Sequence, residues 1–174
     1  MDAERRLLLA SALLARGVAQ AQDNARPSEV LYLHGSALRQ HRILTPAELA
    51  AQPAETIASF VQSRGAPGSE SRTTVRGVRL ARLIERSGLT QAARNDWKNL
   101  LVTVTATDGY RAQFTWVELT NTVAGEGVLV LFEREGAPLD AREGRIALLA
   151  TGDLRLGARH VRNALRIEVR AVAD

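Results

Sequence analysis

The chain has 174 residues, of which 45% are hydrophobic and 24% are charged, a composition that predicts one globular domain with its own core. Its formal net charge is +4, but the basic residues, all arginines except Lys98, are spread along the chain rather than gathered with aromatic residues, so we do not expect nucleic-acid binding. The chain has no cysteine, which excludes disulfides, thiolate metal sites and a cysteine nucleophile.

The first 22 residues have the order of features of a secretory signal peptide. A basic start precedes an apolar run over residues 7–15, and small residues near Ala21 resemble a cleavage site. Because Arg16 follows the run closely, an amphipathic N-terminal helix packed on the domain or on a partner is the alternative. The run is shorter than the ~20 apolar residues of a membrane span, so we expect no membrane span. Cleavage would start the mature protein near Gln22 and place it in the periplasm.

The domain is expected over residues 30–174, after a polar linker at residues 23–29. A strand is predicted at residues 30–34. Thr45, followed by a proline and then by Glu48, has the pattern of a helix N-terminus and predicts a short helix that ends near Gln52.

The middle of the chain predicts one more strand, a long loop and a helix. Residues 56–61 have strand character, and residues 62–71 are rich in glycine, proline and serine, which predicts a flexible loop. The segment 75–79 leads into a helix at residues 80–87, whose leucines and isoleucine share one face. Residues 90–99 are expected to connect this helix to the next strand.

The second half of the chain predicts mainly strands. Asp108-Gly109 is a two-residue turn signal between strands at residues 101–106 and 110–114. The other expected elements are a short helix beginning at 116–119, a turn at 135–138, and strands at 128–132, 146–149 and 165–171. The whole pattern predicts an α+β domain that is mostly β, with mixed sheets and a few short helices.

The segment between the last two strands is the strongest candidate for a binding loop. Its glycines let the backbone approach a ligand, and its arginines offer planar forks of donors for phosphate, carboxylate or heteroaromatic edges. The candidate residues are Thr151, Gly152, Asp153, Gly157, Arg159, His160 and Arg162. We expect Arg159, with Arg162 and His160, to contact an anionic or pterin-like ligand above Gly152 and Gly157. The alternative is a hairpin connection with solvated arginines.

Five motifs, in this order, resemble the oxidoreductase molybdopterin-binding domain of the sulfite oxidase type, from about residue 30 to residue 172. They are LYLHGSALRQHRILTPAELA, RGVRLARLIERSGL, VTATDGYRAQFTWVEL, VLVLFEREGAPLDAREGRIALLATGD and GARHVRNALRIEV. The resemblance implies a largely β fold around a pterin-cofactor pocket. Since the family hairpin lies near that pocket, Asp108 and Tyr110 are expected to line it, although an ordinary turn is the alternative for both.

The chain departs from this family where the metal is bound. Family enzymes place a molybdenum-ligating cysteine after the third strand, and the matching segment, residues 60–65, holds Ser63 and Arg64 instead. A serine hydroxyl is a harder and far less acidic donor than a thiolate. The basic loop of the family is kept as Arg159 and Arg162. The cofactor expected is therefore a pterin or molybdopterin without a metal, with Arg64 added to the candidate ligand-binding residues and no catalytic residue.

Two classes of function follow, and a third is left open. The first is a non-catalytic periplasmic binding module that holds a pterin-like ligand and signals to a protein partner. The second is a molybdopterin-dependent oxidoreductase or a subunit of one. The third is an interaction platform with an empty pocket.

Overall fold

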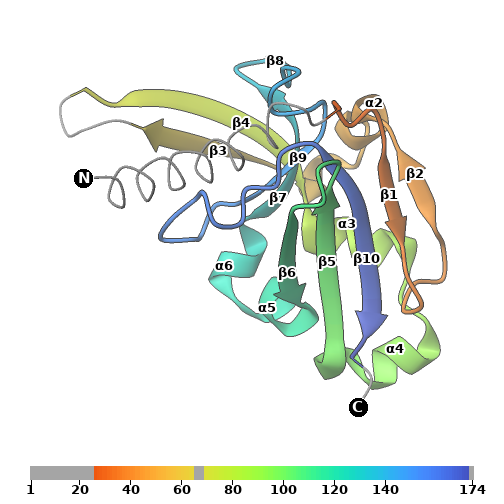
Figure 1. The fold of residues 1–174 in the computed structure, drawn as a ribbon. Coiled ribbons are helices and arrows are strands. Elements are labelled where there is room, and N and C mark those ends of the chain that lie inside the picture. The colour runs from red at the N-terminus through yellow and green to blue at the C-terminus, as the bar shows by residue number, and fades with distance from the viewer. Residues whose placement is uncertain (1–25, 65–68, 173–174) are drawn as a thin grey trace, which may run out of the picture.

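The computed structural model describes residues 26–64 and 69–172, which form two sheets packed face to face with a few short helices (Figure 1). The first sheet has the order β2 (Arg42–Leu44), β1 (Leu31–His34), β10 (Ala164–Ala171), β5 (Leu100–Ala106) and β6 (Arg111–Thr115). The second runs β3 (Ile57–Arg64), β4 (Ser71–Arg79), β7 (Val128–Arg134), with β8 (Ala137–Pro138) and β9 (Ala147–Ala150) on the far edge of β7. Only the β1–β10 pair among these is parallel.

The helices are short and lie between or beside the strands. They are α2 (Pro46–Ala50), α3 (Leu80–Ser87), α4 (Gln91–Asn95), α5 (Trp116–Asn121) and α6 (Val123–Glu126), with 3₁₀ turns at Ala54–Thr56 and Trp97–Asn99. The mixed, mostly β α+β class predicted from the sequence is confirmed. Within the described residues, no helix has the length and apolarity needed to cross a membrane. The expected signal peptide, residues 1–22, lies outside the described residues.

Local sequence signals explain several elements. The Thr45 hydroxyl accepts a bond from the Glu48 amide at 3.2 Å while the Glu48 carboxylate accepts one from the Thr45 amide at 2.8 Å, so the capping box at α2 is confirmed. The helix predicted at residues 80–87 is α3, whose apolar face is buried. The turn at Asp108-Gly109 joins β5 to β6, with Gly109 at φ +87°.

One expectation for a connecting segment is wrong, and two others are incomplete. The predicted loop 62–71 is shorter, because β3 continues to Arg64 and β4 begins at Ser71, each pairing with the other along its length. Segment 75–79 leads directly into α3 as expected, and it is also the second half of β4, because its backbone pairs with both β3 and β7. Residues 90–99 contain α4, which begins where the Thr90 hydroxyl accepts the Ala93 amide at 3.2 Å.

The connection after β9 is not a hairpin. Strand β9 pairs with β7 in the second sheet, whereas β10 lies in the first sheet between β1 and β5. All four residues of β9 are buried, because both of its faces are covered. Strand β7 is buried over most of its length in the same way, whereas β10 has one exposed face. Residues 151–163 therefore cross from one sheet to the other.

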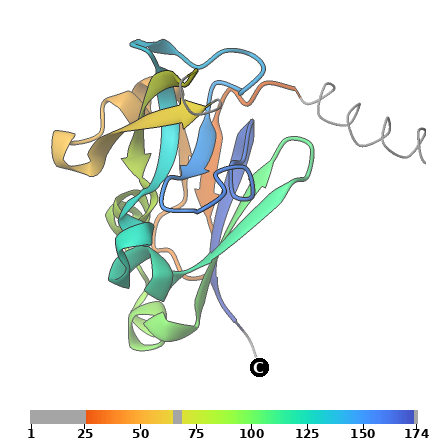
Figure 2. The same ribbon diagram turned by 90° about the vertical axis from the view of Figure 1, so that its left-hand side faces the viewer.

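The main core lies between the sheets (Figure 2). Its members come from the inner face of the first sheet, from α3 and from one face of β7 and β9. A smaller cluster on the opposite face of the second sheet contains Leu129, Leu131 and Leu149, with partly buried Leu156 packed against it. Because the crossing segment supplies Leu156, it covers the second sheet as well as linking the two. The end of the expected linker also packs on the domain, since the buried Ser28 hydroxyl donates to the Ile146 carbonyl at 3.0 Å.

Candidate functional site

The crossing segment forms a closed loop. Leu148 and Val161 exchange both backbone hydrogen bonds, at 2.8 and 2.9 Å. The chain that leaves the end of β9 therefore returns to pair with the same strand. A compact loop whose ends meet in this way is the Ω type, which often carries function. Tyr110 ties the β5–β6 turn to this loop, because its hydroxyl donates to the Ala158 carbonyl at 2.7 Å.

A cavity of about 440 Å³ lies between this loop, the β5–β6 turn and the end of β3. This volume falls in the range of small-molecule sites. Its lining residues are Gln62, Ser63, Asp108, Tyr110, Arg142, Leu156, Gly157, His160, Arg162 and Asn163. Five of the residues predicted from the sequence are therefore brought together: Asp108, Tyr110, Gly157, His160 and Arg162.

Two buried amide side chains in the cavity wall lack partners for their oxygens. Gln62 is 2% exposed and Asn163 is 5% exposed, and neither Gln62 Oε1 nor Asn163 Oδ1 has a hydrogen-bond partner among the described residues. An unsatisfied buried acceptor costs about 1–3 kcal/mol. The backbone of Asn163 is held firmly, because its backbone N–H donates to the Glu143 carbonyl at 2.7 Å and its backbone carbonyl accepts from the Thr107 N–H at 3.0 Å. Both residues line the cavity, so its wall contains two buried amide side chains whose oxygens lack a partner.

His160 is fixed in the wall by a buried carboxylate. Its Nε2 lies 2.9 Å from Glu143 Oε1, and Arg134 holds the same carboxylate through bonds of 2.7 and 2.8 Å. Burial raises the pKa of Glu143, but the hydrogen bonds from His160 and Arg134 outweigh it and lower the pKa to about 2. Glu143 is therefore ionised and accepts only, so His160 Nε2 carries a hydrogen.

Two arginines of the cavity remain available to a ligand. Arg142 and Arg162 are exposed, and within the described ranges neither forms an ion pair with a carboxylate. The same wall holds Asp108, whose Oδ1 accepts the Tyr110 amide at 2.8 Å. The cavity therefore combines guanidinium donors for an anion with buried amide acceptors for a polar ring edge.

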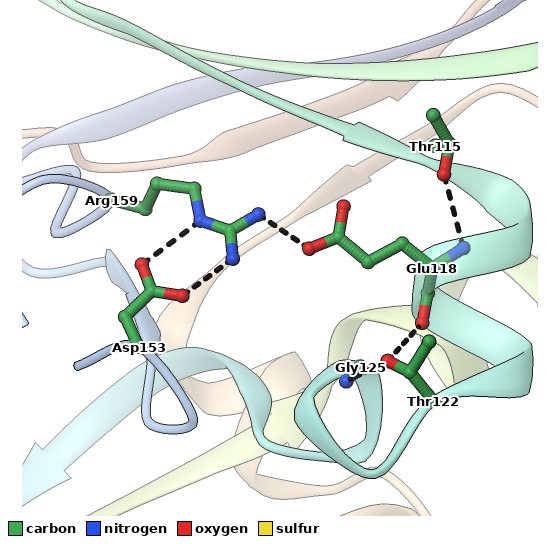
Figure 3. Close-up of polar contacts among 6 residues, drawn as sticks. All are labelled: Thr115, Glu118, Thr122, Gly125, Asp153 and Arg159. Carbon is green, nitrogen blue, oxygen red and sulfur yellow. Dashed lines mark hydrogen bonds and ion pairs between the residues drawn. The ribbon is translucent and has the colours of Figure 1, made fainter.

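Arg159 has a different role from the one predicted. Its Nε donates to Asp153 Oδ2 at 2.9 Å and its Nη1 to Glu118 Oε1 at 2.6 Å (Figure 3). The guanidinium also lies 4.6 Å from the centre of the Phe114 ring. The hydrogen bonds to Asp153 are the strongest influence and raise the pKa of Arg159. Burial opposes this effect, and the bond to Glu118 raises the pKa further. Its charge is thus compensated by two carboxylates, and it does not line the cavity.

Glu118, one of the two carboxylates that bind Arg159, lies in the first turn of α5. The Thr115 hydroxyl caps the helix by accepting from the Glu118 amide at 3.1 Å, and the Thr122 hydroxyl donates to the Glu118 carbonyl at 2.8 Å (Figure 3). Arg159 therefore fastens the closed loop to a capped helix from another part of the chain.

The remaining predicted residues lie outside the cavity wall. Thr151 donates through its amide to the Gly127 carbonyl at 3.0 Å, and Asp153 binds Arg159. The space expected to hold a ligand above Gly152 is filled by α6, since a Cβ on Gly152 would lie 2.9 Å from the Ala124 Cα. Arg64 ends β3, paired with Ser71 across the hairpin.

Sequence reasoning missed Gln62, Arg142 and Asn163, which meet at the cavity although they lie up to 101 positions apart in the sequence. Ser63, which the motif resemblance singles out next to Gln62, also lines the cavity. A comparison with models of known protein families finds no match to the chain, and a comparison with curated proteins finds none either.

Proposed function

We propose that this chain is a non-catalytic periplasmic binding module of the sulfite-oxidase-like type, which holds a pterin-like ligand in the cavity and signals to a protein partner. The observation that carries the proposal is the pair of buried, unpartnered amide oxygens of Gln62 and Asn163 in a cavity that also holds Arg142 and Arg162. A site that buries acceptors without partners selects a ligand that supplies the missing donors.

The chemistry of a pterin matches this arrangement. Its amino group and ring N–H groups are donors that can satisfy the two amide oxygens, and an anionic substituent can meet the guanidinium groups of Arg142 and Arg162. Glu143 holds the His160 side chain in one orientation, so the imidazole would meet a bound pterin ring with a fixed edge.

The residues present do not fit molybdenum. The resemblance matches Ser63 to the family's thiolate position, and a serine hydroxyl is a poor ligand for a soft metal–sulfur centre. Among the described residues, no group of three or more histidine, aspartate and glutamate side chains is placed to hold a metal ion. The chemistry of the Ser63 hydroxyl favours the pterin ring over a metal-bearing cofactor, because the chain has no cysteine thiolate to offer a metal.

Calorimetry tests the ligand with the full chain, using unsubstituted pterin and pterin-6-carboxylate. We expect the carboxylate to bind, and Arg162→Ala to weaken it about tenfold or more, since a hydrogen bond to a charged group is worth about 1.5–3 kcal/mol. The control is Arg155→Ala, because Arg155 is exposed in the same loop and does not line the cavity. No binding of either compound to the wild-type protein, or equal losses in the two variants, would refute the proposal.

Two further measurements address the rest of the proposal. Metal analysis of protein purified from a molybdopterin-producing host would support the oxidoreductase alternative if molybdenum were stoichiometric. Mass spectrometry of the periplasmic fraction should find a chain that starts near Gln22. An intact N-terminus confined to the cytoplasm would contradict the periplasmic location.

A further inference from the structure

Within residues 26–64 and 69–172, no helix covers the outer face of the first sheet. Figure 2 shows the helices on the other side of this sheet, toward the second sheet. Along each strand, residues alternate between the buried core and this outer face, as Leu31, Tyr32 and Leu33 do in β1. The outer face therefore presents a flat row of side chains from each of five strands.

The strand register fixes which side chains lie next to one another on this face. One row crosses all five strands in the order Ile43, Tyr32, Arg166, Thr105, Arg111. The row has an apolar end on β2 and β1, where Ile43 is 59% and Tyr32 is 41% exposed, and a basic end on β10 and β6. The face is thus divided into two parts of different chemistry.

Two adjoining hollows follow the same division. The first, of about 630 Å³, is lined mainly by apolar groups that include Tyr32, Ile43 and Leu165. The second, of about 260 Å³, is polar and is lined by Arg111, Arg166 and Arg170 among others. His34 and Arg166 line both hollows, so the two adjoin on the sheet, and we call them together the groove.

The charge of the polar hollow selects an acidic occupant. Arg111, Arg166 and Arg170 surround it with one carboxylate, Glu168, and within residues 26–64 and 69–172 none of the three arginines forms an ion pair. A second copy of the chain would bring the same cations against them. An acidic protein segment can supply carboxylates to the arginines and an apolar side chain to the first hollow.

We propose that this groove binds an acidic segment of a partner protein, with an apolar or aromatic side chain against Tyr32 and Ile43 and carboxylates against Arg111, Arg166 and Arg170. The row spans four strand spacings, roughly 19 Å, which an extended segment of about six residues covers. This inference gives a chemistry to the partner of the proposed function, but it does not depend on the identity of the cavity ligand.

Selection from a displayed library of random peptides of about 12 residues, twice the estimated length, tests the proposal on the full chain. We expect enriched peptides to combine aspartate or glutamate with an aromatic or aliphatic residue. Fluorescence anisotropy of an enriched peptide should show affinity about tenfold or more weaker for Arg166→Glu, and similarly for Arg111→Glu. The matched control is Arg94→Glu, which changes the net charge equally on exposed α4 and should leave the affinity within about twofold.

Several outcomes would overturn the inference. These are no enrichment, enrichment of basic or uncharged peptides, equal losses in Arg166→Glu and Arg94→Glu, or tighter binding of single-stranded RNA at the same arginines. A dimer in light scattering that Arg166→Glu dissociates would assign the face to a second copy instead. Circular dichroism checks that each variant is folded. Arg162→Ala should leave peptide binding unchanged, and Arg166→Glu should leave pterin binding unchanged, so the two proposals fail independently.

Discussion

At the scale of single residues, Arg159 is a structural clamp between the closed loop and α5. Arg159→Ala leaves Asp153 and Glu118 without their partner, so we expect the free energy of unfolding to fall by about 1.5–3 kcal/mol in urea titrations. Arg159→Lys should recover part of this loss, since a point charge cannot reproduce the planar fork. Arg155→Ala is the control and should change stability by less than about 0.5 kcal/mol. Equal effects of the two alanine variants would contradict the clamp.

Glu143 predicts how stability depends on pH. Its pKa is lowered in the folded protein from 4.5 to about 2, so its contribution is complete above its unfolded pKa and is lost as pH falls from about 4.5 through about 2. The shift corresponds to about 3 kcal/mol. Urea unfolding at about pH 6 and about pH 3 should show a smaller pH-dependent loss in Glu143→Gln than in the wild-type protein. The same loss in both would show that other carboxyl groups control acid unfolding.

At the scale of elements, Gly144 makes possible the approach of segment 139–145 to the start of β10. It has φ +81°, and a Cβ there would lie 2.3 Å from Asn163 Oδ1 and 2.6 Å from Asn163 Cα. Gly136, in the β7–β8 turn, has a similar φ of +76° but nothing within 4 Å of its Cβ position. We expect Gly136→Ala to cost about 1–2 kcal/mol from backbone strain alone, and Gly144→Ala to cost clearly more. Gly144→Ala should also abolish pterin binding, because Asn163 must move.

Unfolding titrations and calorimetry on the two glycine variants separate strain from steric clash. If both lose the same stability and both keep ligand affinity, the contact between Gly144 and Asn163 does not shape the cavity.

The elements that the sequence predicted well are those with local signals. The capping box at Thr45 and the Asp108-Gly109 turn depend on residues within a few positions of each other, and both form as expected. The pairing of β9 with β7 could not be predicted, because buried strands of similar composition compete as partners and the choice depends on tertiary packing. The same limit applies to Arg159, whose partner Glu118 lies 41 positions earlier.

At the scale of the whole molecule, the cavity lies where the two sheets meet the crossing segment. Gln62 comes from β3 of the second sheet, Asp108 and Tyr110 come from the turn of the first sheet, and Arg162 and Asn163 follow the closed loop. The predicted loop and hairpin each supply part of this wall. Gln62 and Arg142 belong to neither, and they reach the wall because β3 and the segment between β8 and β9 come together in the folded chain. A ligand in the cavity therefore contacts both sheets at once.

Because of this position, ligand binding should stabilise the whole domain rather than one loop. A ligand that binds only the folded state adds about 2.7 kcal/mol at about one hundred times its Kd, which for a chain of this length raises the melting temperature by roughly 5–10 °C. Pterin-6-carboxylate should produce this rise in the wild-type protein and in Arg166→Glu, whose substitution lies on the outer face. At the same concentration, Arg162→Ala should show a rise smaller by about 3 °C or more, since tenfold weaker binding removes about 1.4 kcal/mol. Calorimetric binding without any rise in melting temperature would mean that the unfolded chain binds the compound as well as the folded domain does, which would contradict the folded cavity as its site.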